Sequence, residues 1–284
     1  MYLYVAETSQ DEKADVKIEV KKEITKEITK DELGQLNSAF FMCGIYHSIK
    51  QIECIVVENG EDFKQYMSEQ NLLFMRNSGV SSERIIMLAN KYVLNYASAI
   101  KTYIDMEKRL LKKHKTEEDV KAFEEMCRSF YDKHIEYRFW VNFRNYIVHC
   151  EFPYSIYKEE LNGGCKVICT KERLLRFDNW KHSKADILEM DEAIDLTKLI
   201  DDMNGMIYAL YMDFFRGVHK EIMEGIQIYG DFCRKYNVQS PIILKTKERN
   251  KMEGARMQPL PIKELRACFG ILKSHPHVDF KIKE

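Results

Sequence analysis

The sequence has few of the residues that interrupt regular secondary structure. Its 284 residues include only 12 glycines and 5 prolines. Turn-rich β sandwiches and barrels need many such residues, so their scarcity favours long helices over those folds. The sequence also has no unbroken apolar run of about 18 residues, so we expect no membrane span.

An excess of charge of either sign is also absent. The chain carries 44 basic and 45 acidic residues, a net charge of −1. This excludes a protein that coats nucleic acid through its overall positive charge, although it leaves a local basic groove open. The 8 cysteines are too dispersed for a disulfide scaffold, and the N-terminus lacks the basic and apolar segments of a secretory signal. We therefore expect reduced thiols and a cytoplasmic location.

Apolar residues at helical spacing predict four long helices. The first covers residues 33–58 and ends at Asn59-Gly60, with a looser stretch from there to about residue 81. The second covers 83–113 with Ser81 or Ser82 as its N-cap, and the third begins at Thr116 and ends near Phe152 because of Pro153. A kink or break is expected near Asp132. The fourth helix runs from Asp191 to about residue 235.

The remaining segments predict little helix. Residues 154–190 form a small β-like insert, in which Cys165–Thr170 alternates like a strand and Asn162-Gly163-Gly164 marks a turn. Residues 1–32 form a charged extension, with a possible strand at Tyr2–Val5 and a period of two at Val16, Ile18 and Val20. Residues 236–284 form a mostly irregular extension with a short helix near 262–273. The predicted fold is all-α, an antiparallel bundle of four to five helices over residues 33–235, with the insert after the third long helix.

The segment Phe139–Pro153 holds the residues best suited to chemistry. Its sequence, FWVNFRNYIVHCEFP, places Arg144, Asn145 and His149 among aromatic and aliphatic residues near the end of a helix. Asn145 and His149 share a face, whereas Arg144 and His149 lie about 140° apart around the axis. The negative end of the helix dipole favours a protonated imidazole at His149.

Two copies of this helix, facing each other across a dimer axis, bring two arginines and two histidines into one groove. Such a groove suits a phosphodiester. Arginine binds the phosphate through paired hydrogen bonds, and histidine transfers protons.

The pattern of Arg144, a polar residue, three further residues and His149 near the end of a bundle helix resembles the HEPN superfamily. The approach to the motif from Phe130 and the helical segment Asn95–Asp105 are also similar to HEPN toxins and abortive-infection proteins. The resemblance covers about residues 34–232. It implies an all-α homodimer that acts as a metal-independent endoribonuclease, in a bacterial toxin–antitoxin or anti-phage setting, with an antitoxin or other regulatory partner.

The resemblance also implies the residue roles. The RNA 2′-OH would attack the adjacent phosphate and leave a 2′,3′-cyclic phosphate. His149 would act as general base or acid, Arg144 would bind the phosphate, and Asn145 would orient either of them. In one toxin subgroup, a tyrosine two residues after the histidine is modified by a nucleotidyltransferase antitoxin. Glu151 stands at that position here, so we do not expect that form of silencing.

A catalytically silent HEPN-like module that binds a protein or a nucleotide is the alternative. In that case Arg144 pairs with Glu136 or with a neighbouring helix, and His149 only caps its helix. Glu136 and a polar stripe at spacings of three and four are candidates to support the site or contact RNA; the stripe consists of Asn95, Ser98, Thr102 and Asp105. The stripe can equally be a hydrogen-bond ladder between helices or a solvent face.

We expect no metal and no cofactor. Cys165 and Cys169, with Cys150, His149 and His182 nearby in sequence, do not have the spacing of a structural zinc site. Two cysteines four apart in a strand share one face, which fits ordinary packing. The sequence also lacks the clustered carboxylates that a metal-dependent hydrolase needs. The basic residues between Lys245 and Arg256 could contact the RNA backbone, but a solvated tail is the favoured interpretation.

Overall fold

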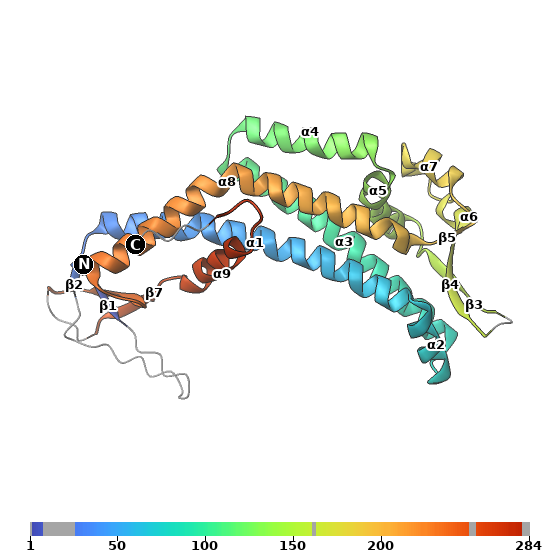
Figure 1. Ribbon diagram of the computed structural model, residues 1–284, viewed down its shortest axis with the longest axis horizontal. Coiled ribbons are helices and arrows are strands. Elements are labelled where there is room, and N and C mark those ends of the chain that lie inside the picture. The colour runs from blue at the N-terminus through green and yellow to red at the C-terminus, as the bar shows by residue number, and fades with distance from the viewer. Residues whose placement is uncertain (1, 8–25, 161–162, 250–253, 280–284) are drawn as a thin grey trace. The chain divides into compact units, whose positions relative to one another are not determined.

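The structure, a computed structural model, describes residues 2–7, 26–160, 163–249 and 254–279 (Figure 1). The chain forms two compact units, one of residues 49–216 and one of residues 1–48 together with 217–284. Two helices, α1 (Lys30–Met67) and α8 (Ile200–Tyr236), contribute residues to both units. The Arg144–His149 motif lies wholly in the unit of residues 49–216.

Most of the described residues are helical, which confirms the mainly α character of the fold. The antiparallel bundle arrangement stays a prediction. Between α1 and α8 the chain forms α2 (Glu69–Asn77), α3 (Ser82–His114), α4 (Glu117–Lys133), α5 (Ile135–His149), α6 (Lys171–Leu174) and α7 (Ser183–Glu189). Short 3-10 turns occupy Asp178–Trp180 and Leu196–Leu199, and α9 (Ile262–Lys273) confirms the predicted C-terminal helix.

Local capping signals correctly predicted several helix ends. The Ser81 side chain accepts a hydrogen bond from the Arg84 N–H at the start of α3. Thr116 and Asp119 form a reciprocal capping box at the start of α4. The predicted break near Asp132 is also present, because His134 separates α4 from α5 and is the cap residue of both.

The predicted end of the first helix at Asn59-Gly60 is wrong, since α1 continues to Met67. Gly60 is a close-packing position rather than a helix terminator. A Cβ there would lie 2.9 Å from Ile200 Cγ2 and 3.0 Å from Tyr96 Cε2. The absence of a side chain therefore lets α1, α3 and α8 approach one another, and this tertiary contact outweighs the helix-ending signal.

Two further boundaries differ from the prediction. The stretch before residue 81 contains α2, whose N-cap Ser68 accepts a hydrogen bond from the Asn71 N–H. The fourth long helix begins at Ile200 rather than Asp191, because β5 (Ala193–Ile194) and a 3-10 turn precede it.

The predicted β insert is present in the unit of residues 49–216. β3 (Tyr154–Glu159), β4 (Cys165–Thr170) and β5 form an antiparallel sheet in that order. Gly163, in the predicted turn, has a φ of +88°, a conformation that favours glycine. Asn162 of the same turn lies outside the described residues.

The prediction of a single non-helical insert and a mostly irregular tail is wrong. In the other unit, β1 (Tyr2–Glu7), β2 (Lys26–Ile28), β6 (Pro241–Thr246) and β7 (Arg256–Pro259) form a four-stranded sheet in the order β2-β1-β6-β7. β1 pairs antiparallel with β6, with Tyr4 opposite Leu244. The two predicted extensions are thus joined in one sheet. The possible strand at Tyr2–Val5 is present, whereas Val16, Ile18 and Val20 lie outside the described residues.

One helix has the length and composition of a membrane span. An 18-residue window of α1 has a mean hydropathy of 1.2, and 44% of that window is buried in the structure. The core helix of a soluble protein meets the same criterion, so the composition of α1 does not by itself indicate a membrane.

Candidate functional site

Aromatic packing fixes the helix that carries the motif. The Trp140 ring meets Tyr96 of α3 edge-on, with ring centroids 4.7 Å apart, and its Nε1–H donates to the Leu199 carbonyl at 3.0 Å. Trp180 stacks on Phe139 at 5.5 Å and on Tyr146 at 5.4 Å. These large side chains are fully buried. One face of α5 is therefore held firmly against its neighbours.

A polar contact on the flank of α5 adds to this anchoring. Arg138 Nε and Nη2 donate to the two carboxylate oxygens of Asp186 in α7, at 2.5 and 2.7 Å. The two side chains are only 16% and 11% exposed. Asn142 Nδ2 also donates to Ser183 Oγ at 3.1 Å. A bidentate pair of this kind sets the rotation of α5 as well as its position.

The opposite face of α5 carries the predicted catalytic residues. Arg144 is half-buried, and Asn145 and His149 are exposed. Val148, between them, is 53% exposed. Within the part of the chain that the structure describes, none of the three polar side chains forms a hydrogen bond or an ion pair. By helical geometry, Arg144 and His149 lie about 140° apart on the two edges of this outward face.

The contacts expected for a purely structural role of Arg144 and His149 are absent among the described residues. Glu136 precedes Arg144 by eight residues, about 12 Å along the helix, and the described residues include no ion pair between them. His149 is the last residue of α5, but the cap contact that follows it is made by the Cys150 N–H to the Tyr146 carbonyl. Arg144 and His149 are therefore free for another partner.

A charged cluster that the sequence analysis missed lies directly after the motif. Glu151 pairs with Arg173 at 2.6 Å and with Arg176 at 3.4 Å. Arg173 also donates to the Phe152 carbonyl at 2.6 Å and to Ser155 Oγ at 2.9 Å. These contacts tie the chain that leaves α5 to α6. The only signal for them in the sequence is the opposite charge of residues more than twenty positions apart.

The other predicted support residues lie away from the motif. Asn95, Thr102 and Asp105 are exposed on α3 and Ser98 is half-buried, so the stripe is a solvent face rather than a ladder between helices. Thr102 Oγ1 donates to the Ser98 carbonyl, and Asp105 pairs with Lys101 at 2.8 Å. Glu136 is half-buried in the first turn of α5, about 20 Å along the helix from His149.

The cysteines near the motif, Cys150, Cys165 and Cys169, do not form a reactive centre. No group of three or more His, Cys, Asp or Glu side chains in the described part of the chain is placed to hold a metal. Cys165 and Cys169 are both buried on one face of β4, as the alternation predicts. Cys150 is next to His149 and is exposed, but limited desolvation and then the nearby Glu151 carboxylate raise the pKa of its thiol. That shift disfavours the nucleophilic thiolate.

Comparison with known proteins identifies no relative. No protein-family pattern, no curated protein and no solved structure matches this chain. The site must therefore be interpreted from its own residues.

Proposed function

We propose that the chain is a metal-independent endoribonuclease with Arg144, Asn145 and His149 as its catalytic residues. The observation that carries the proposal is the contrast between the two faces of α5. One face is fixed by buried aromatic rings, and the other presents an arginine, an amide and a histidine that form no hydrogen bond or ion pair with the residues described by the structure. Arg144 has no ion pair or hydrogen bond with the described residues, so its guanidinium can bind a phosphate without giving up a contact within the chain.

These residue types suit cleavage of RNA by its own 2′-hydroxyl. The 2′-oxygen attacks the adjacent phosphorus and the bond to the 5′-oxygen breaks, which leaves a 2′,3′-cyclic phosphate and a 5′-hydroxyl. His149 takes the proton of the 2′-hydroxyl as general base, or gives a proton to the departing 5′-oxygen as general acid. Arg144 donates to the non-bridging phosphate oxygens as their negative charge increases. Asn145 orients the phosphate or the imidazole.

A homodimer through the outward face of α5 would complete this site. Arg144 and His149 lie on opposite edges of the face, so one helix cannot easily direct both at one phosphate. In a symmetric pair of α5 helices, Arg144 of one copy lies next to His149 of the other. The exposed Val148 and Phe152, at 53% and 48%, supply apolar surface for that contact.

Cleavage of RNA by purified protein in the presence of EDTA tests the proposal. Total RNA and a defined single-stranded RNA are incubated with the wild-type protein and with the variants Arg144→Ala and His149→Ala. Matched controls are Arg128→Ala and His134→Ala, which remove the same residue types at exposed positions on α4 and at its C-cap. All five proteins are first checked for folding and for their oligomeric state.

We expect the wild type and the two controls to leave cyclic-phosphate ends. Both motif variants should lose at least about 100-fold in rate, a loss typical for removal of an acid–base group at His149 or of a donor to transition-state charge at Arg144. Cleavage that persists in the two motif variants would refute the site. Cleavage that stops with EDTA would refute metal independence.

The alternative function is a catalytically silent module that binds a protein or a nucleotide. The exposed Val148 and Phe152 beside the motif are the observation that favours it, because exposed apolar residues often mark a protein interface. If no protein cleaves RNA, the wild type and the motif variants are expressed in cells and their toxicity is compared. Toxicity of the wild type that Arg144→Ala and His149→Ala both abolish would indicate a repressed nuclease. No cleavage and no toxicity would favour the binding module. A bacterial toxin–antitoxin or anti-phage setting, with a restraining partner, belongs to the nuclease proposal.

A further inference from the structure

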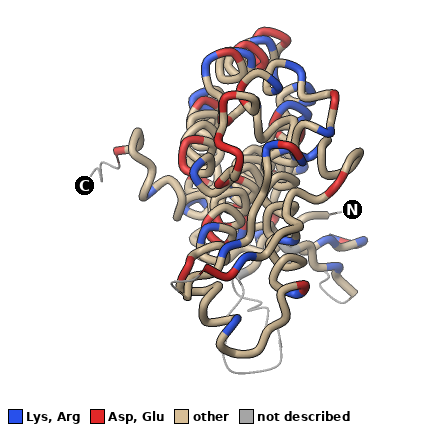
Figure 2. Tube along the Cα trace, turned by 90° about the vertical axis from the view of Figure 1, so that its right-hand side faces the viewer, with Lys and Arg blue, Asp and Glu red and all other residues tan. Residues whose placement is uncertain are grey.

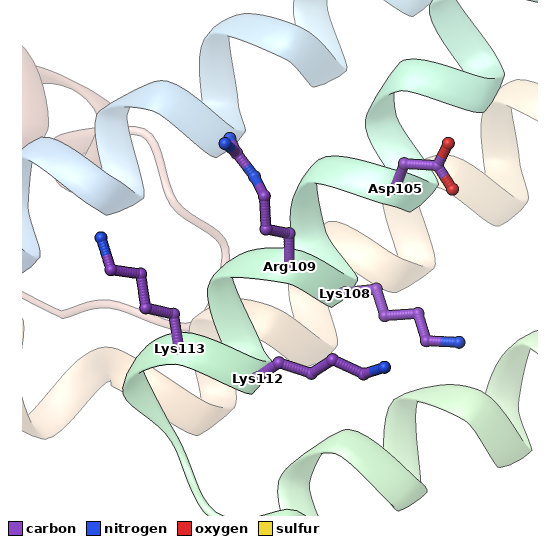
Figure 3. Close-up of a pocket in the computed structure, with 5 residues that line it drawn as sticks. All are labelled: Asp105, Lys108, Arg109, Lys112 and Lys113. Carbon is purple, nitrogen blue, oxygen red and sulfur yellow. The ribbon is translucent and has the colours of Figure 1, made fainter.

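Four cationic side chains project from the C-terminal turns of α3. Together with Asp105 they line a shallow hollow of about 390 Å³; they are Lys108, Arg109, Lys112 and Lys113. Lys108 and Lys112 extend together on one side of the helix, and Arg109 and Lys113 extend on another (Figure 3). The cations therefore form a positive band across the end of α3.

This band has little compensating charge. The carboxylate of Asp105 pairs with Lys101 at 2.8 Å, and Glu124 of α4 pairs with Lys108 at 2.8 Å. Arg109, Lys112 and Lys113 are exposed, and among the described residues none of them forms an ion pair. Basic and acidic residues alternate along much of the trace in Figure 2. Of Arg109, Lys112 and Lys113, only Lys112 lies near enough to Glu124 to interact with its carboxylate. The three cations are thus a local excess in a chain of net charge −1.

The helix dipole explains only part of this arrangement. It favours Lys112 and Lys113, which lie in the last turn of α3, but its effect falls off beyond that turn, where Arg109 lies. Lys108 with Lys112 and Arg109 with Lys113 are also like-charge pairs four residues apart, each of which destabilises a helix by about 0.2–0.5 kcal/mol. A bound polyanion would relieve this repulsion.

The band also continues the polar stripe of α3. Arg109 and Lys112 follow Asp105 at the same spacings of four and three that relate the earlier stripe residues. The exposed face from Asn95 to Lys112 therefore offers amide and hydroxyl groups and then cations over about 26 Å of helix. It lies on the exposed side of α3, opposite the buried side whose Tyr96 packs on Trp140 of α5.

We propose that this face of α3 binds the phosphodiester backbone of the RNA strand that the Arg144–His149 site cleaves. The inference rests on the proposed function for the identity of the strand. Arg109 binds a phosphate through two parallel hydrogen bonds, and Lys112 and Lys113 act as point charges on neighbouring phosphates. Contacts of this kind position a strand without reading its sequence.

Binding of an uncleavable RNA tests the inference separately from catalysis. The probe is a fluorescent 2′-O-methyl single strand of about 12 nucleotides, within the usual range of single-strand site sizes. Its anisotropy is measured with the wild type and with the triple variant Arg109→Gln/Lys112→Gln/Lys113→Gln. The control triple variant removes exposed, unpaired lysines at other places in the same unit: Lys133→Gln, Lys158→Gln and Lys184→Gln.

We expect the α3 triple variant to bind the probe on the order of tenfold more weakly than the wild type. The slope of log K against log salt should also be smaller in magnitude by about 2, because each phosphate contact on a single strand contributes about 0.7 to that slope. The control triple variant should stay within about twofold of the wild type. The single variant Arg109→Gln serves if the triple variant does not fold, with an expected loss of about threefold.

Equal losses in the two triple variants, no loss in either, or no binding by the wild type would each overturn the inference. A parallel assay with cleavable RNA separates the two proposals. Binding that depends on the band without any cleavage would support the band as an RNA-binding surface and would leave the nuclease to the toxicity comparison described above. If the protein cleaves RNA but the α3 triple variant binds the probe as tightly as the wild type, the nuclease proposal stands and the RNA-binding inference is refuted.

Discussion

Glu107 of α3 is a buried acid whose ionisation should control the stability of its unit. The side chain is 1% exposed, and one of its oxygens, Oε2, has no hydrogen-bond partner. Burial raises its pKa from 4.5 to about 8, with the Asp213 carboxylate adding to the rise and the Tyr103 hydroxyl opposing it. Glu107 is therefore mostly protonated in the folded protein at neutral pH.

The direction of the pH dependence follows from the two pKa values. Between pH 4.5 and about 8 the folded state holds a proton that the unfolded state has lost. Stability is therefore fully present below pH 4.5 and falls by about 1.4 kcal/mol per pH unit as the pH rises toward 8. From pH 5 to pH 8 the loss from this one group is on the order of 3 kcal/mol.

Glu107→Gln removes this titration while keeping the size of the side chain. Urea unfolding is followed by tryptophan fluorescence at pH 5, 6, 7 and 8. Both tryptophans of the chain, Trp140 and Trp180, are buried in the unit that contains Glu107. We expect the difference in free energy of unfolding, Glu107→Gln minus wild type, to increase by about 3 kcal/mol from pH 5 to pH 8.

The exposed carboxyl of Glu125 on α4 provides the control. Glu125→Gln should keep the pH dependence of the wild type, because no buried charge is removed. Parallel curves for the wild type and Glu107→Gln from pH 5 to 8 would refute the reasoning, because they would mean that Glu107 is already ionised in the folded state.

Three further substitutions test packing and anchoring in the same unit. Gly60→Ala should destabilise the unit by about 1–3 kcal/mol, because the new Cβ would lie 2.9 Å from Ile200 Cγ2. By contrast, Gly205→Ala should stabilise α8 by up to about 1 kcal/mol, because a Cβ there would have no atom within 4 Å. Urea titrations of the two variants check the contrast, and similar effects at both glycines would contradict it. Asp186→Asn should cost about 2 kcal/mol, because it leaves the Arg138 guanidinium nearly buried without its bidentate partner. Loss of less than about 0.5 kcal/mol in the same titration would show that this pair does not anchor α5.

The HEPN resemblance and the structure bear on different parts of the proposal. The resemblance supplies the reaction and the roles of Arg144 and His149. The structure supplies a physical reason to test them, because these two residues and Asn145 lie on the outward face of a firmly packed helix. The residues that support this face could not be found from the motif. Asp186 lies 48 positions from Arg138, and Arg173 lies 22 positions from Glu151.

The sequence by itself determined the local structure. Ser81 and the Thr116–Asp119 box set helix starts through hydrogen bonds within one turn, and the alternation of Cys165–Thr170 set a strand with one buried face. Such signals depend on neighbours within a few residues, so they can be read along the chain.

Only the tertiary structure decided the features that depend on distant contacts. Gly60 continues a helix because Ile200 and Tyr96 fill the space where its side chain would lie. β1 and β6 are strands because each pairs with a segment more than 230 residues away. The polar stripe of α3 lies in solvent because the opposite face of that helix, with Tyr96 and Tyr103, is the one that is buried. In each case the free energy comes from burial and pairing between segments that local sequence does not relate.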